Sequence, residues 1–264
     1  MSTVNSKTAT PAAQSEGQDD DQSFRTFLEA LEKNNELVRF AKPVDPLRNM
    51  SAIEWKTYNE LGKASLFTNI EGHPGWRACS QIVADRRKLS IGLGLPEETL
   101  LQDVAKRMKQ AIPSTAYRGA APVKAVRLMG DDADLTALPA VKVSERDSAR
   151  YIPSGIAFVK DPETGVGNLS LHRMEIKGPR KSGFVMLPRH ARRIYDKYSQ
   201  RGLPTPIAIV IGVHPAIWIS AGYTTGPGID ELGLAGGLLG LLRRALRQSR
   251  SQRSQPRETQ QVAA

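Results

Sequence analysis

The sequence predicts an α+β protein, with an α/β N-terminal domain over residues 23–115 followed by a mainly β second domain. Two patterns carry this expectation. Apolar residues recur at helical spacing in the first part of the chain, whereas the second part holds short apolar runs separated by turns rich in Gly and Pro. The composition agrees, because 40% hydrophobic and 24% charged residues are ordinary values for a globular protein.

The first domain is expected to open with an amphipathic helix. Phe24, Phe27, Leu28 and Leu31 recur at spacings that place them on one helical face. The elements expected after it, in chain order, are a strand over 37–40, a helix over 51–61, a strand over 64–70 and a helix over 96–112, which Pro96 would start and Pro113 would end.

The second domain is expected to be built mainly from strands. Alternating or continuous apolar runs predict strands over 123–128, 156–160, 168–177 and 207–213. Two helices are expected among them, over 189–198 and 230–246, the second interrupted by glycines.

The two ends of the chain differ from the middle in composition. Residues 1–22 are rich in Ser, Thr, Gln and Asp, and residues 248–264 contain no Ile, Leu, Phe, Trp or Tyr. Neither segment offers enough apolar surface to offset the entropy of ordering. We therefore expect a disordered leader over 1–22 and a disordered Arg/Gln/Ser-rich tail over 248–264.

The net charge of +10 raises the hypothesis of a nucleic-acid partner, since clustered basic residues neutralise phosphates. Half of that charge lies in residues 241–264, which hold six arginines and one glutamate. This segment has no interleaved aromatic residues for base stacking, and no helix-turn-helix or zinc pattern is present. Nucleic-acid binding is therefore the less favoured interpretation.

The cysteine count and the absence of a long apolar run indicate where in the cell the protein is expected. Cys79 is the single cysteine, so no internal disulfide can form, and no run of 18 apolar residues is present. Residues 1–22 contain no apolar stretch of the kind found in a secretory signal. These features predict a cytoplasmic protein without a membrane span.

Three polar side chains make a candidate metal site. Asn168 lies on an expected strand, His190 opens an expected helix, and Glu231 starts another. An amide oxygen, an imidazole nitrogen and a carboxylate suit Mn²⁺ or Mg²⁺, with phosphate or water at the remaining positions. The same residues also have ordinary roles, as turn residue, solvated surface histidine and helix-dipole partner, and spacing does not decide between the two interpretations.

A set of segments, taken in order, resembles the UbiD family of prenylated-flavin-dependent decarboxylases over about residues 23–240. The matching segments are FRTFLEALEKNNELVRFAKPVDP, ASLFTNIEGHPGW, ADLTALPAV, YIPSG, KDPETGVGNLSLHRM, PRHARRIY, IAIVIGVHPA and IDELGLAGGLLG. The resemblance implies a split β-barrel, like that of flavin reductases, for the second domain. Residues 116–247 would form part of this barrel, so that the cofactor domain is incomplete.

The resemblance also implies roles for individual residues. Those expected to line prenylated FMN are Asn168, Leu169, Ser170, Leu171, His172, Arg173, Arg189 and His190. The resemblance assigns Arg173 to the reacting carboxylate as the catalytic residue. It gives Mn²⁺ to Asn168, His190 and Glu231, and a K⁺ ion to backbone groups around Leu169 and 221–223. From the residues alone, His172 is equally consistent with a place beside a cofactor and with a place in the core.

The implied activity is the reversible, non-oxidative decarboxylation of an aromatic or α,β-unsaturated carboxylic acid. The cofactor would act as the electron sink that loss of CO₂ requires. A flavin prenyltransferase would supply it. Family members also form homo-oligomers through a C-terminal domain.

The chain departs from the family pattern after LAGGLLG. Family members continue into a Val-Pro-Ala segment and two glutamates, one of them the acid/base partner of the Arg matched by Arg173, whereas this chain reads LLRRALRQSRSQRSQ. We therefore expect impaired turnover and hypothesise that the tail is out-of-frame or mis-spliced translation. Two alternatives stay open: an inactive fragment that binds nucleic acid or an acidic partner through its basic residues, and an electron carrier that holds ordinary FMN.

Overall fold

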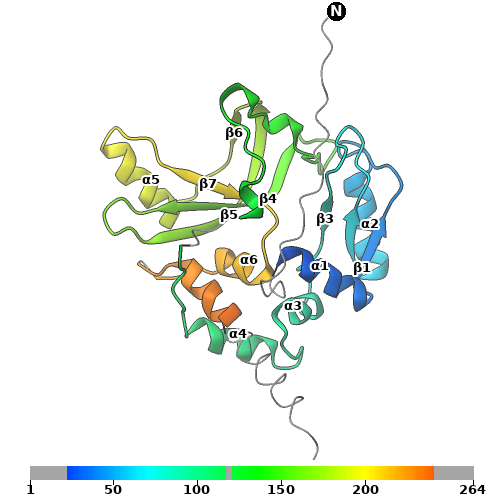
Figure 1. The fold of residues 1–264 in the computed structure, drawn as a ribbon, viewed down its shortest axis with the longest axis horizontal. Coiled ribbons are helices and arrows are strands. Elements are labelled where there is room, and N and C mark those ends of the chain that lie inside the picture. The colour runs from blue at the N-terminus through cyan, green and yellow to red at the C-terminus, as the bar shows by residue number, and fades with distance from the viewer. Residues whose placement is uncertain (1–22, 117–120, 227, 241–264) are drawn as a thin grey trace, which may run out of the picture.

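The computed structural model describes residues 23–116, 121–226 and 228–240. The expected leader 1–22, the tail 248–264 and the last residues of the expected helix 230–246 lie outside these ranges. The fold is α+β, with two separate sheets and helices packed between and around them (Figure 1). Within the described residues, no helix is both long enough and apolar enough to cross a membrane.

The first sheet belongs to the N-terminal part and has the order β1-β2-β3. Its strands are β1 (Leu37–Phe40), β2 (Ala64–Phe67) and β3 (Ala78–Ser80). β1 and β2 run parallel, so the chain between them must cross over, and α2 (Met50–Leu61) lies in this crossover. α1 (Phe24–Lys33) packs Phe27 and Leu31 against Leu37 and Leu66. The expected helix from Phe24 and strand over 37–40 are confirmed.

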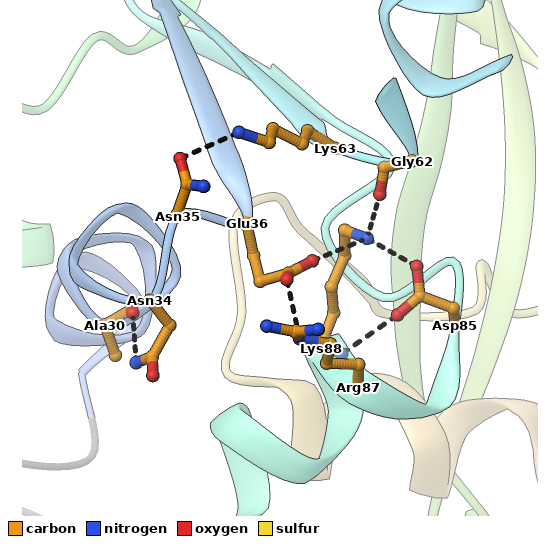
Figure 2. Close-up of polar contacts among 9 residues, drawn as sticks. All are labelled: Ala30, Asn34, Asn35, Glu36, Gly62, Lys63, Asp85, Arg87 and Lys88. Carbon is orange, nitrogen blue, oxygen red and sulfur yellow. Dashed lines mark hydrogen bonds and ion pairs between the residues drawn. The ribbon is translucent and has the colours of Figure 1, made fainter. Parts of the chain in front are cut away.

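A fully buried lysine ties three elements of this part together. Lys88 lies on α3 (Arg86–Leu93), and its Nζ donates to the Gly62 carbonyl at 2.5 Å and to Asp85, the residue that caps α3. Glu36 lies 3.4 Å from the same Nζ and also pairs with Arg87 at 2.7 Å. Figure 2 shows Glu36, Asp85 and the Gly62 carbonyl around Nζ, with Arg87 on the other oxygen of Glu36. We call Glu36, Gly62, Asp85, Arg87 and Lys88 the Lys88 cluster.

The second sheet is antiparallel throughout and has the order β6-β5-β4-β7. Its strands are β4 (Tyr151–Lys160), β5 (Gly167–Gly178), β6 (Lys181–Gly183) and β7 (Ile207–Val210). The sheet curls into a half-barrel, which agrees with the incomplete split barrel expected from the sequence (Figure 1). β5 matches the expected strand over 168–177 within one residue at each end.

Helices α5 (His190–Gln200) and α6 (Pro215–Gly222) cover this sheet. Ala191 and Ile194 of α5 pack on Val159 of β4. On α6, Ala221 packs with Ile156 and Leu169. The pairing register places Asn168 opposite Val159, Ser170 opposite Ala157 and His172 opposite Gly155. Asn168, Ser170 and His172 therefore share one face of β5, while Leu169 and Leu171 point to the other.

A third group of helices packs against α6. α4 (Leu100–Met108) packs with α6 and with the helical residues 231–240, burying Leu100, Ala216 and Leu238 in one cluster. A Cβ at Gly236 would lie 2.2 Å from the Ile112 carbonyl oxygen, and one at Gly237 would lie 2.6 Å from that of Gln110. The glycines in the GLAGGLLG run therefore allow this helix to approach the backbone after α4.

Several expected elements differ from the structure. The strands expected over 64–70 and 207–213 end early, at Phe67 and Val210, and the strand expected over 156–160 already begins at Tyr151.

Two further elements differ more. No strand forms over 123–128: residues 122–124 make a single 3-10 turn, and Val123 and Val126 are 85% and 69% exposed. The apolar residues there have no adjacent described strand to pair with. The helix expected over 96–112 begins only at Leu100 and ends at Met108. Beyond its end, Ile112 donates its backbone N–H to the Gly233 carbonyl rather than continuing the helix.

Candidate functional site

Glu231 is a buried carboxylate that connects the second sheet to the last described helix. Its side chain is 2% exposed. Oε1 accepts hydrogen bonds from Asn168 Nδ2 at 3.0 Å and from Thr225 Oγ1 at 3.2 Å, and Oε2 accepts one from the backbone N–H of Leu169 at 3.1 Å. These bonds fix the carboxylate at the start of β5, beside the loop that precedes residue 231.

His190 completes this arrangement. It is the first residue of α5, and its Nδ1 lies 4.0 Å from Glu231 Oε1. The structure thus brings together Asn168, His190 and Glu231, the three residues expected to bind a metal, from three separate elements. We call Asn168, His190, Thr225 and Glu231 the Glu231 cluster.

Two groups in the Glu231 cluster lack a full set of partners: the amide oxygen of Asn168 and the carboxylate of Glu231. Asn168 Oδ1 is buried and accepts no hydrogen bond within the described residues. In the same part of the chain, no lysine or arginine forms an ion pair with Glu231, and its three donors are all neutral. Burying a carboxylate without a cation, or an amide oxygen without a donor, destabilises the folded state.

The donor types fit a hard or borderline divalent cation. Carboxylate and amide oxygens with one imidazole nitrogen are ligands that Mn²⁺ and Mg²⁺ accept, and a cation would compensate both the unpartnered oxygen and the carboxylate charge. Among the described residues, no three side chains of the types His, Cys, Asp and Glu lie close enough together to hold a metal ion. The Glu231 cluster contains two residues of these types, and its third donor is the amide of Asn168.

His172 lies further along the same face of β5. Its Nε2 is 2.9 Å from Ser170 Oγ, and its ring packs on Phe184 at a centroid distance of 4.7 Å. Burial lowers the pKa of His172, although a hydrogen bond with Val185 acts in the opposite sense. The imidazole is therefore neutral at physiological pH and is held between a hydroxyl and an aromatic ring.

Leu169 and Leu171 have a different environment from their neighbours. Their side chains pack with Ile156 and Ala221 under α6. Any contact that these two residues make with a cofactor on the other face of β5 would therefore involve their main-chain atoms.

The two candidate arginines contact different parts of the fold. Arg173 Nη2 is 2.9 Å from Asp147 Oδ1, and its guanidinium carbon lies 3.9 Å from the centre of the Tyr151 ring. Arg189, the residue before α5, donates weakly to Thr224 Oγ1 at 3.4 Å. Both guanidinium groups remain exposed enough to meet a ligand.

Sequence reasoning did not single out Thr225 or Asp147. Thr225 lies in the loop TTGPGID, whose Gly and Pro residues indicate a turn but not which side chain points inward. Asp147 is far from Arg173 in sequence, and no local spacing connects the two. Only the arrangement of β4 and β5 brings them together.

Cys79 and His214 have structural environments. Burial raises the pKa of the Cys79 thiol to about 12, so the reactive thiolate is not populated at neutral pH. Burial lowers the pKa of His214 to about 4, and its Nδ1 accepts the backbone N–H of Ala216 at the start of α6. Both side chains therefore have structural roles.

Two family models match the chain. The model described as the 3-octaprenyl-4-hydroxybenzoate carboxy-lyase N-terminal domain covers residues 28–108, and the one described as the Rift-related domain of the same carboxy-lyase covers residues 115–257. The second match continues beyond Leu241, where the resemblance was expected to end.

Curated relatives agree with these matches. Anhydromevalonate phosphate decarboxylase of Methanosarcina mazei is 31% identical over 219 residues, which are 83% of this chain and 49% of the relative. Pyrrole-2-carboxylic acid decarboxylase of Pseudomonas aeruginosa is 29% identical, over 82% of this chain and 47% of the relative. The chain thus spans about half the length of the curated relatives it matches.

Solved structures share the fold. An evolved dimeric form of the UbiD-class enzyme HmfF from Pelotomaculum thermopropionicum, in complex with prFMN, superposes with a TM-score of 0.77 at 32% identity, over 82% of this chain and 50% of that one. Apo 3,4-dihydroxybenzoic acid decarboxylase (AroY) of Klebsiella pneumoniae gives 0.75 at 28% identity, over 83% and 49%. From its two family matches, its relatives and its fold, this chain belongs to the UbiD family of carboxy-lyases.

Proposed function

We propose that this chain carries the metal- and cofactor-binding part of a decarboxylase that removes CO₂ from an aromatic or α,β-unsaturated carboxylic acid. The observation that supports this most is the Glu231 cluster, in which a buried carboxylate and an unpartnered Asn168 Oδ1 lie beside His190. It occurs in a fold shared with a UbiD-class enzyme in complex with prFMN.

Asn168, His190 and Glu231 would hold Mn²⁺, or Mg²⁺ in its place, which would anchor the phosphate of prenylated FMN. The backbone near Leu169 and residues 221–223 would hold K⁺. When bound, the prenylated flavin supplies an electron sink for the charge that loss of CO₂ leaves behind. A flavin prenyltransferase would provide this cofactor.

The protein's own residues would orient the acid and exclude water. Arg173 would pair with the substrate carboxylate, because its planar guanidinium can donate to both carboxylate oxygens at once. His172 and Ser170 would line the face of β5 along which the flavin lies. Arg189 would contact the cofactor edge next to Thr224.

The names of the relatives support the proposed substrate class. The relatives that match are named for pyrrole-2-carboxylic acid, phenolic acids and anhydromevalonate phosphate. The first two names indicate a carboxylate on an unsaturated or aromatic framework. We base the proposed substrate class of this chain on them. The cytoplasm is the proposed location.

Coexpression with a flavin prenyltransferase tests the proposal. The purified chain should carry a prenylated-flavin absorbance spectrum and one equivalent of Mn²⁺, and Arg173→Ala should keep both while losing any CO₂ release. Arg180→Ala serves as the control, since Arg180 is an exposed arginine paired with Asp131 outside the Glu231 cluster. A chain that retains neither flavin nor metal would contradict the proposal, and retention of ordinary FMN alone would favour an electron carrier. Impaired turnover stays a prediction, which the CO₂ measurement tests.

A further inference from the structure

We propose that Asp147 is a positioning residue that holds the Arg173 guanidinium in the orientation in which it receives the substrate carboxylate. The inference rests on the proposed function, because it gives Asp147 a role only if Arg173 binds the acid. Its support is the geometry around Arg173.

Two groups restrain the guanidinium from different directions. Asp147 Oδ1 contacts Nη2 at 2.9 Å, and the Tyr151 ring lies 3.9 Å from the guanidinium carbon. An ion pair at the edge of the guanidinium and an aromatic ring against its face together restrict both its direction and its plane. An unrestrained arginine loses rotamer freedom on binding a carboxylate, and here part of that loss has already occurred before the ligand binds.

Asp147 is itself held in place. Its Oδ2 accepts the backbone N–H of Ser144 at 3.0 Å, and its own N–H donates to the Ser144 carbonyl at 3.0 Å. The surrounding loop is closed by reciprocal backbone hydrogen bonds between Val141 and Tyr151, at 3.1 and 2.8 Å. One Asp147 oxygen is thus engaged by its own loop and the other by Arg173.

This division leaves donors on Arg173 for a ligand. A guanidinium has five N–H groups, and the contact from Nη2 to Asp147 Oδ1 occupies only part of one edge. Within the described residues, the ion pair through Nη2 is the one salt bridge that Arg173 makes. Its other N–H groups stay available to a second carboxylate.

The charge state of Asp147 agrees with this role. Burial alone would raise the pKa of its carboxyl, but hydrogen bonds from Ser144, Arg173 and Val143 outweigh that effect, and the pKa lies below its usual range. Asp147 is therefore ionised at neutral pH, and the contact is charge-assisted.

The test compares binding of acids with binding of their uncharged carboxamides. Dissociation constants for benzoate, pyrrole-2-carboxylate and crotonate, each beside its amide, are measured by calorimetry on the prenylated-flavin-loaded chain. The ratio of the amide to the acid dissociation constant measures the contribution of the carboxylate contact. A general packing defect would weaken binding of the acid and the amide alike and would leave this ratio unchanged. The variants are Asp147→Asn, Arg173→Ala, the double variant and Asp131→Asn, whose wild-type carboxylate pairs with the exposed Arg180.

We expect Asp147→Asn to lower the preference for the acid about fivefold to tenfold, within the usual range of coupling between neighbouring groups. Arg173→Ala should lower it further, and Asp147→Asn should add nothing in the Arg173→Ala background. Asp131→Asn should leave it unchanged. If Asp147→Asn does not fold, Asp147→Glu, which keeps the charge, should retain part of the preference.

The outcomes separate the inference from the proposed function. If Arg173→Ala lowers the acid preference but no Asp147 variant does, the inference is overturned and the proposed role of Arg173 stands. If the wild-type chain shows no acid preference, or Arg173→Ala leaves it intact, the proposed role of Arg173 fails and the inference fails with it.

Discussion

The Lys88 cluster and the Glu231 cluster both bury charged side chains, but they differ in how completely these are paired. At Lys88, a buried ammonium has two carboxylates and a carbonyl around it, and one of those carboxylates pairs with Arg87 as well (Figure 2). At Glu231, a buried carboxylate receives only neutral donors, and the amide oxygen of Asn168 receives none within the described residues.

This difference separates a structural network from a ligand site. A lysine has three N–H donors, and the Lys88 cluster offers three acceptors within ion-pair or hydrogen-bond distance, so nothing there requires an additional ligand. The Glu231 cluster has excess acceptor capacity and negative charge. A divalent cation would compensate both, whereas a neutral ligand would compensate only the unpartnered oxygen.

The largest expected effect is on stability, at the Lys88 cluster. Lys88→Met removes the cation between Glu36 and Asp85 and leaves these carboxylates without their buried partner. We expect a loss of about 3 to 5 kcal/mol in the free energy of unfolding, measured by urea denaturation. Folded Lys88→Met should bind Mn²⁺ as the wild-type chain does.

Lys63→Met is the matched control for this substitution. Among the residues that the structure describes, the Lys63 Nζ donates to the side chain of Asn35 alone, at 2.7 Å, near the same sheet. Its loss should cost about 1 kcal/mol or less. Equal destabilisation by the two variants would contradict the view that pairing within the Lys88 cluster, rather than burial of any lysine stem, stabilises this part of the fold.

A smaller effect is expected from the hydroxyl that orients Glu231. Thr225→Val removes the hydrogen bond from Oγ1 to Oε1 while keeping the side-chain volume. Groups that orient a metal ligand commonly contribute about tenfold to metal affinity, and we expect a loss of that size in a Mn²⁺ titration. Thr224→Val, at the neighbouring threonine that contacts Arg189 instead, should leave affinity unchanged. If both variants bind Mn²⁺ equally well, Thr225 has no such role.

The smallest effect concerns the helix that carries His190. Asp161 in the β4–β5 turn pairs with Lys197 of α5 at 2.7 Å, and this hydrogen bond, followed by backbone donors in the turn, lowers the pKa of Asp161. A lowered pKa in the folded state contributes stability above the unfolded value of 3.8, and this is lost as pH falls through the folded value.

Asp161→Asn keeps the turn acceptor and removes the charge. We expect it to cost about 0.5 kcal/mol near neutral pH, in view of the exposure of Lys197, and nothing below the folded-state pKa of Asp161. Denaturation curves at both pH values check this. A cost that persists in acid would show that the effect is one of packing rather than of charge.

Part of this picture could be predicted from sequence. Helical and strand periodicity located α1, β1, α2 and β5, because each of these elements buries an apolar face. Periodicity failed at 123–128, where the apolar residues have no adjacent described strand to pair with and stay exposed. Whether a short apolar run becomes a strand depends on a partner that local sequence does not reveal.

The site shows the same limit. Residue chemistry and family resemblance pointed to Asn168, His190 and Glu231, but not to the unpartnered Oδ1 of Asn168 or to the lack of a cationic side chain paired with Glu231 among the described residues. Thr225 and Asp147 could not be found from spacing, since their partners lie on other elements. Satisfaction of polar groups is a property of the assembled fold.

Binding of Mn²⁺ tests the central claim most directly. Electron paramagnetic resonance of free aqueous Mn²⁺ is followed as the purified chain is added, with inorganic phosphate present, for wild type and Glu231→Gln. We predict that the wild-type chain removes one equivalent of Mn²⁺ from the free signal and that Glu231→Gln weakens binding at least about a hundredfold. An unchanged free signal with the wild-type chain, or equal binding by the variant, would contradict the assignment of the Glu231 cluster as a cation site.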